Sequence, residues 1–150
     1  ISIGDTPSLR FYNSEILNGI DELRPGNFVY FDVMQYMAGH CDWSDIAVAL
    51  KSPVLSLYPD RNEVLVHAGA VHLSKESCTM PDGKIGFGVA VKLTANGIGQ
   101  IIEGAFVDRV SQEHGILRVA SKFFNEFKPG DSIGILPVHS CLMVSAMSEK

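Results

Sequence analysis

A chain of 150 residues, with 46% hydrophobic and 19% charged side chains, is long enough to bury one sizeable core and too apolar to be disordered. Its net charge of −5 and the lack of a lysine or arginine cluster argue against nucleic acid or an anionic membrane as a partner. No apolar run is long enough to span a bilayer, and the first residues lack a secretory signal pattern.

The cysteines and the first residues indicate where the protein works and how the chain begins. Three cysteines at irregular spacing argue against a disulfide framework and favour reduced thiols, which is typical of a cytoplasmic protein. Ile1-Ser2-Ile3-Gly4 has the composition of a strand end, and Gly4 and Pro7 then break it into a turn. We therefore expect a fragment or processed piece, whose first residues belong to a domain other than the one that follows.

Two glycine-containing turns near the N-terminus are candidate anion sites. Gly4-Asp5-Thr6 and Arg24-Pro25-Gly26-Asn27 each place a glycine where backbone N–H groups can turn toward a phosphate. Ordinary turns explain the same residues, and both interpretations stay open at this point.

From Phe28 onward the pattern predicts short strands separated by turns. The aromatic and β-branched run Phe28–Met34 predicts a buried strand, and the residues up to Trp43 a loop. Further strands are predicted over residues 45–58 with a kink at Pro53, and over residues 63–67, 86–92, 100–110 and 115–119. Turn residues separate these runs, and residues 123–127 allow at most one short turn of helix. Regularly spaced strands favour a mainly β, barrel-like domain.

The last strand-like run, Gly130–Met143, carries a histidine and a cysteine two residues apart. On an extended backbone His139 and Cys141 would point to the same face, because side chains alternate with period 2. An imidazole and a thiolate make half of a tetrahedral zinc site, and the remaining positions stay open for water or substrate. The alternative is a strand that carries a small apolar cysteine and a hydrogen-bonded histidine. The spacing alone does not decide between them.

In a series of ordered blocks, the chain resembles the C-terminal half of the D-threonine aldolase and D-serine dehydratase family. The blocks are SIGDTPS, ELRPGNFVYFDVMQ, YPDRNEVLVHAGAVHLSKES, SQEHGIL and KPGDSIGILPVHSCLM. Such enzymes are relatives of alanine racemase, in which a pyridoxal phosphate-binding α/β (TIM-type) barrel precedes a mostly β domain. The resemblance implies that residues 1–26 end the cofactor-binding barrel and that residues 27–150 form the β domain. It also implies a homodimer.

The resemblance further implies which residues face the cofactor. Gly4, Asp5 and Thr6 match a late barrel strand near the cofactor phosphate. Gly26 and Asn27 match the next strand, whose N–H groups also reach that phosphate. Arg24, just before them, matches the alanine racemase position that approaches the pyridine nitrogen.

The family's metal pair matches His139 and Cys141. The aldolases more often carry a carboxylate at the second position, with manganese or magnesium, so a cysteine there favours zinc on grounds of ligand softness. In such an enzyme the cofactor acts as an electron sink and the metal as a Lewis acid on the substrate hydroxyl. The implied function is a lyase, either an aldolase or a dehydratase, that acts on small D-3-hydroxy amino acids.

The family's Schiff-base lysine lies upstream of the matched blocks, so the resemblance implies that this chain alone is inactive. Two alternatives to the lyase stay open. One is an amino-acid racemase of the alanine racemase type that uses no metal. The other is a non-catalytic assembly domain in which His139 and Cys141 are structural.

Overall fold

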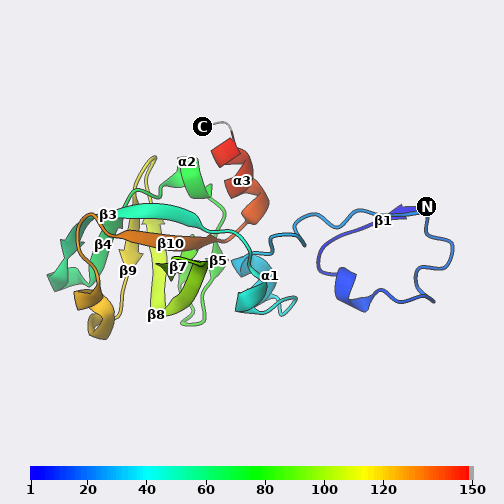
Figure 1. Cartoon of the computed structure of the whole chain (residues 1–150), viewed down its shortest axis with the longest axis horizontal. Coiled ribbons are helices and arrows are strands. Elements are labelled where there is room, and N and C mark those ends of the chain that lie inside the picture. Colours follow the sequence, from blue (N-terminus) through cyan, green and yellow to red (C-terminus); the bar gives the residue numbers. More distant parts are fainter. Residues whose placement is uncertain (149–150) are drawn as a thin grey trace.

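A closed antiparallel barrel with strand order β10-β3-β4-β9-β8-β7 forms the centre of the computed structural model, which describes residues 1–148 (Figure 1). The barrel strands are β3 Leu50–Tyr58, β4 Glu63–Val66, β7 Gly88–Thr94, β8 Gly97–Val110, β9 Gly115–Arg118 and β10 Ser132–Pro137. Closure pairs both edges of each of these strands, which removes the exposed edges of an open sheet. The mainly β, barrel-like fold expected from the sequence is confirmed.

The barrel interior is filled by side chains that alternate along each strand. In β3 the inward positions from Leu50 to Val54 are buried and the intervening ones exposed, as a half-buried strand requires. Val64, Leu117 and Ile135 from three other strands are fully buried in the same core cluster. Burial of such aliphatic side chains contributes about 1.5–3 kcal/mol each to folding.

Several of the predicted strands and turns are found at the expected residues. The strands over residues 100–110 and 115–119 pair as β8 and β9. Asn62 and Gly97, in the turns before β4 and within the β7–β8 hairpin, have positive φ values of 54° and 114°. Near the expected kink at Pro53, the β3–β4 register shifts between Val54 and Ser56.

The run Phe28–Met34 is not the buried strand that its composition predicts. Phe28 and Val29 are 42% and 61% exposed, and helix α1 (Val33–Met37) begins inside the run and extends into the predicted loop. Phe31 has a left-handed φ of 48°, and the Asp32 side chain caps α1 by accepting a hydrogen bond from the Gln35 N–H. A favourable helix cap therefore outweighs the β-propensity of the aromatic residues.

The predicted last strand is also shorter than expected. β10 ends at Pro137, and helix α3 (Ser140–Ser148) follows after two residues. His139 lies in the connection and Cys141 in the first turn of α3. His139 and Cys141 therefore do not lie on one face of a strand, contrary to the prediction from their spacing.

Residues 1–26 extend away from the barrel (Figure 1). There β1 (Ser2–Ile3) pairs in parallel with β2 (Glu22–Leu23), and the connection contains a short 3-10 helix at Leu9–Phe11. Parallel pairing, which requires such a crossover connection, is typical of α/β folds.

The remaining elements are short and lie around the barrel. A hairpin is formed by β5 (Cys78–Thr79) and β6 (Ile85–Gly86), and helix α2 (Ala70–Leu73) packs against α3. Three further 3-10 helices span Trp43–Asp45, Pro59–Arg61 and Ser121–Glu126. Within residues 1–148, no helix has the length and apolarity needed to cross a bilayer.

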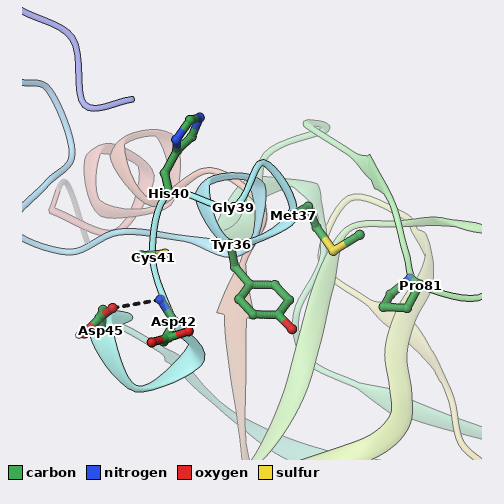
Figure 2. A pocket seen from close by; sticks show the side chains of 8 residues that line it. All are labelled: Tyr36, Met37, Gly39, His40, Cys41, Asp42, Asp45 and Pro81. Carbon is green, nitrogen blue, oxygen red and sulfur yellow. Dashed lines mark hydrogen bonds between the residues drawn. The ribbon is translucent and has the colours of Figure 1, made fainter. Parts of the chain in front are cut away.

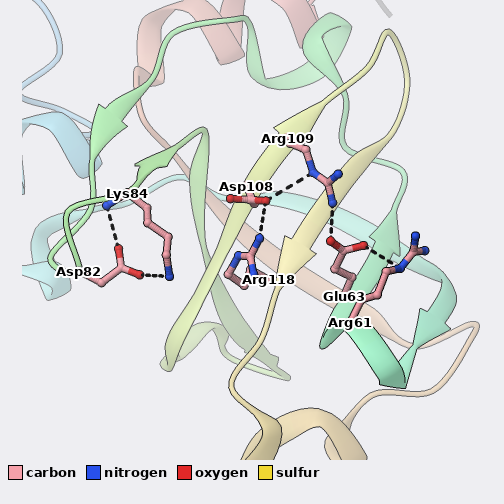
Figure 3. Close-up of polar contacts among 7 residues, drawn as sticks. All are labelled: Arg61, Glu63, Asp82, Lys84, Asp108, Arg109 and Arg118. Carbon is pink, nitrogen blue, oxygen red and sulfur yellow. Dashed lines mark hydrogen bonds and ion pairs between the residues drawn. The ribbon is translucent and has the colours of Figure 1, made fainter.

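A network of ion pairs joins β4, β8 and β9 on the outside of the barrel (Figure 3). The Glu63 carboxylate accepts a hydrogen bond from Arg109 and lies 3.3 Å from Arg61. Asp108 accepts a hydrogen bond of 3.0 Å from Arg118, which raises the pKa of that guanidinium. Because the arginines are partly exposed, each pair contributes about 1 kcal/mol or less to stability.

Candidate functional site

A cavity of about 320 Å³ opens where residues 4–27 approach α1 and the start of α3. Its lining contains every residue to which the family resemblance assigns a cofactor or a metal, namely Gly4, Asp5, Thr6, Arg24, Gly26, Asn27, His139 and Cys141. The rest of the lining is Pro7, Asp32, Met34 and Gln35. The fold thus brings the two glycine turns and the histidine–cysteine pair to one space, although more than a hundred residues separate them in sequence.

The two glycines play different parts in the walls of this cavity. A Cβ atom added at Gly4 would lie 2.4–2.6 Å from backbone atoms of Arg24, so only glycine lets β1 and β2 approach this closely. A Cβ added at Gly26 would meet only the Thr6 hydroxyl oxygen, at 3.9 Å. Gly4 is therefore required by packing, whereas Gly26 leaves open space.

Asp5 and Arg24 make hydrogen bonds within the N-terminal segment. The Asp5 carboxylate accepts from the Ser8 N–H at 2.6 Å and from its hydroxyl at 2.9 Å, so it holds the turn. The Arg24 Nε donates to the Ser2 hydroxyl at 2.9 Å and lies 3.4 Å from Glu22. The approach of Arg24 to a pyridine nitrogen stays a prediction.

Thr6 and Asn27 join the two turns to each other. Both are buried, and the Thr6 hydroxyl oxygen accepts a hydrogen bond of 2.9 Å from the Asn27 backbone N–H. That N–H group is therefore engaged within the protein. The bond holds the turn after β1 against the turn after β2, beside the cavity.

His139 and Cys141 reach the cavity from the connection between β10 and α3. The Nδ1 atom of His139 is buried and has no hydrogen-bond partner in the structure, whereas Cys141 is exposed. An orphaned buried nitrogen costs about 1–3 kcal/mol unless water, a metal or another group satisfies it, so this atom is available as a ligand. Within residues 1–148, no cluster of three or more His, Cys, Asp or Glu side chains is placed to hold a metal. The pair would therefore supply two ligands.

Two further residues of this cavity escaped the sequence reasoning. Asp32 is 1% exposed and makes several hydrogen bonds, and the Oε1 atom of Gln35 is buried without a partner. An Asp followed three residues later by a Gln is a helix N-terminus signature. That signal was present in the sequence and would have identified both the start of α1 and the importance of Asp32.

A second cavity, of about 680 Å³, lies beyond α1 and contains none of the candidate residues (Figure 2). Its lining includes Cys41, Asp42 and Asp45, and the His40 ring points away from the two carboxylates. Burial, followed by the charges of Asp45, Asp32 and Asp42, raises the pKa of the Cys41 thiol to about 11. Such a thiol is a poor nucleophile and a poor metal ligand near neutral pH.

We expect Cys41 to be alkylated slowly. A pKa raised from 9.0 to about 11 lowers the thiolate fraction at pH 8 about 100-fold, and the greater nucleophilicity of a more basic thiolate offsets part of this loss. Iodoacetamide should therefore react about 10-fold more slowly than with an unperturbed thiol. A time course by peptide-resolved mass spectrometry measures this rate, with the exposed Cys141 as the internal comparison in metal-free protein. Equal rates at the two cysteines would contradict the expected protection of Cys41.

A family model described as "Putative serine dehydratase domain" matches residues 47–149. The D-serine dehydratase of Dictyostelium discoideum is 32% identical over 99% of this chain and 38% of its own length. The D-threo-3-hydroxyaspartate dehydratase of Delftia sp. strain HT23 is 29% identical over 94% of this chain and 37% of its own length. The chain thus spans less than half the length of these relatives.

The chain is also similar in structure to solved proteins of this kind. An alanine racemase-like protein from Idiomarina loihiensis has a TM-score of 0.83 and 28% identity, over 97% of this chain and 38% of that one. The Delftia enzyme has a TM-score of 0.82 and 27% identity, over the same shares of the two chains. Two further solved structures of a D-threo-3-hydroxyaspartate dehydratase carry an alanine in place of a histidine and of a cysteine two positions later, the latter in a metal-free form. The chain therefore belongs to the D-threonine aldolase and D-serine dehydratase family and corresponds to the family's C-terminal, mainly β domain.

Proposed function

We propose that the chain is the metal-bearing part of a pyridoxal phosphate-dependent and divalent-metal-dependent lyase acting on small D-3-hydroxy amino acids. The observation that carries this proposal is the single cavity lined by both glycine turns, His139 and Cys141. The relatives' names support it, because D-serine and D-threo-3-hydroxyaspartate are both D-amino acids with a 3-hydroxyl group. These relatives are dehydratases, so we favour elimination of water over retro-aldol cleavage.

The metal in this proposal is held by His139 and Cys141. The orphaned Nδ1 of His139 fits a missing ligand partner, and thiolate with imidazole favours zinc over manganese or magnesium. The two-residue spacing matches that of the histidine and cysteine altered in the D-threo-3-hydroxyaspartate dehydratase variants. A divalent metal held by these two residues would supply Lewis-acid assistance to the departure of a substrate hydroxyl group.

The cofactor in this proposal lies against the two glycine turns, with residues 1–26 belonging to its α/β barrel. The open space beside Gly26 and the parallel β1–β2 pair fit this arrangement. Pyridoxal phosphate supplies an electron sink when it is bound. No lysine among the residues that the structure describes lines the cavity, so we infer that the Schiff-base lysine lies in another part of the protein and that these residues alone are inactive. We also propose that the full-length protein is a homodimer in the cytoplasm.

The proposed reaction is tested by a substrate panel on the full-length protein, with and without a chelator. D-Serine and D-threo-3-hydroxyaspartate should yield a keto acid and ammonia. Chelation should lower the rate at least about 100-fold, and added zinc should restore it, because a Lewis acid contributes several kcal/mol to the elimination.

Each other outcome of this panel has a distinct meaning. Glycine and an aldehyde as products would indicate an aldolase, and inversion at Cα without cleavage would indicate a racemase. Rates that are unchanged by the chelator would remove the metal from the mechanism. The same panel run on a variant that lacks both His139 and Cys141 tests the pair directly, and unchanged turnover there would favour a non-catalytic role for it.

A further inference from the structure

The carboxylate of Asp32 accepts hydrogen bonds from three separate segments at the back of the cavity. Its Oδ1 accepts from the Gln35 N–H at 2.9 Å, at the start of α1. Its Oδ2 accepts from the side-chain amide of Asn27, in the second glycine turn. The same Oδ2 accepts from the Ser140 N–H at 3.0 Å and from the Ser140 hydroxyl at 3.3 Å. Asp32 is 1% exposed, so these bonds are shielded from competing water.

Ser140 is the residue between His139 and Cys141, and it is fully buried. Its N–H belongs to the peptide group shared with His139, so the bond to Asp32 fixes the backbone on both sides of that group. A second bond, from the Met34 N–H to the Val138 carbonyl at 3.2 Å, ties the same connection to α1. The backbone of the histidine–cysteine pair is therefore held from the start of α1 as well as from α3, where the Met143 N–H donates to the His139 carbonyl at 3.3 Å.

The other branch of the network leads to the cofactor-facing turns. Asn27 donates to Asp32 through its side chain and to the Thr6 hydroxyl oxygen through its backbone N–H. A continuous series of bonds therefore runs from Thr6 through Asn27 and Asp32 to Ser140. It links the residues proposed to face the cofactor to the residues proposed to hold the metal.

We propose that Asp32 is a positioning residue that holds the His139–Cys141 connection in the geometry for metal binding and joins it to the cofactor-facing turn at Asn27. This inference rests on the proposed function, because it requires that His139 and Cys141 bind a divalent metal. Asp32 is not one of the proposed ligands, because it is 1% exposed and its Oδ2 already accepts from three donors of the protein.

The variant Asp32→Asn keeps the size and shape of the side chain but changes its hydrogen bonding, so it tests the hydrogen bonds alone. One carboxylate oxygen becomes an NH₂ group, which would face the Gln35 N–H in one orientation and the donors of Asn27 and Ser140 in the other. Either orientation sets donor against donor and releases one side of the network. Loss of a group that orients metal ligands lowers metal affinity by about 10- to 100-fold.

The test measures metal binding by the full-length protein rather than its activity. Zinc affinity is determined by competition with a chromophoric chelator, and cobalt(II) substitution reports on the site through its thiolate-to-metal charge-transfer absorption. We expect Asp32→Asn to bind zinc about 10- to 100-fold more weakly and to change the cobalt spectrum. Glu63→Gln is the matched control, because Glu63 is a buried carboxylate of the ion-pair network outside this cavity. It should leave zinc affinity within about 2-fold, since it affects no bond of the Asp32 network.

Two further variants make the result decisive. If His139→Ala binds zinc as the unmodified protein does, the metal site of the proposed function is wrong. If His139→Ala loses zinc while Asp32→Asn keeps full affinity and an unchanged cobalt spectrum, the role of Asp32 is overturned and the metal site stands. Ser140→Ala covers the case in which Asp32→Asn does not fold, because it removes only the hydroxyl bond. It should weaken zinc binding about 2- to 10-fold, as loss of one hydrogen bond does, and unchanged affinity there would also overturn the inference.

Discussion

Replacing His139 by alanine in the full-length protein should abolish stoichiometric zinc binding and lower the dehydration rate on the order of 10³-fold. The reason is that, in the proposed function, His139 is one of two metal ligands, and its loss would remove Lewis-acid assistance worth several kcal/mol. Metal content by plasma mass spectrometry and the initial rate of keto acid formation measure the two effects. His67→Ala is the matched control, since His67 is also a half-buried histidine but lies outside the cavity lining.

A variant at Cys141 can be tested with the same measurements of metal content and rate. Cys141→Asp should retain a metal but shift the preference from zinc toward manganese or magnesium, because a carboxylate is a harder ligand than a thiolate. A His139→Ala protein with normal zinc content and rate would show that the pair is structural. An equal loss in His67→Ala would show that the effect is a general loss of folding.

Replacing Gly4 by alanine should destabilise the protein by about 1–3 kcal/mol and weaken binding of the proposed cofactor, because overpacking at this position cannot be relieved by a flexible side chain. The added Cβ would lie 2.4–2.6 Å from the N, C and O atoms of Arg24, so β1 and β2 must separate. That movement displaces Thr6 and Asn27 together. A displacement of about 1 Å at a site of this kind lowers the rate by about 100-fold.

Gly26→Ala is the control for this prediction, because its Cβ has open space beside it. We expect it to change the free energy of unfolding by less than about 0.5 kcal/mol, although the methyl group projects toward the proposed cofactor site. Urea unfolding measures stability, and a titration with pyridoxal phosphate measures cofactor affinity. Equal stabilities of the two variants would contradict the packing role assigned to Gly4.

The errors of the sequence-based prediction have one physical origin. Phe28–Met34 was expected to be a strand because its side chains favour strands, and Gly130–Met143 because an apolar run follows a turn. In both stretches a hydrogen bond to Asp32 decides where a helix begins. The Asp32 carboxylate caps the start of α1, and it also accepts from the N–H of Ser140, the first residue of α3. Residue propensity describes one segment at a time and does not include these bonds.

The sequence by itself determined the barrel-like class, most of its turns and the residue types that can bind a phosphate or a soft metal. These follow from local patterns: alternating burial along strands, glycine and asparagine at positive φ, and an imidazole next to a thiol. Only the tertiary structure decided that the glycine turns and the histidine–cysteine pair share a cavity, and that Asp32 bonds across 108 residues to Ser140. Contacts of that range depend on barrel closure and on how the connections pack against it, which no local pattern specifies.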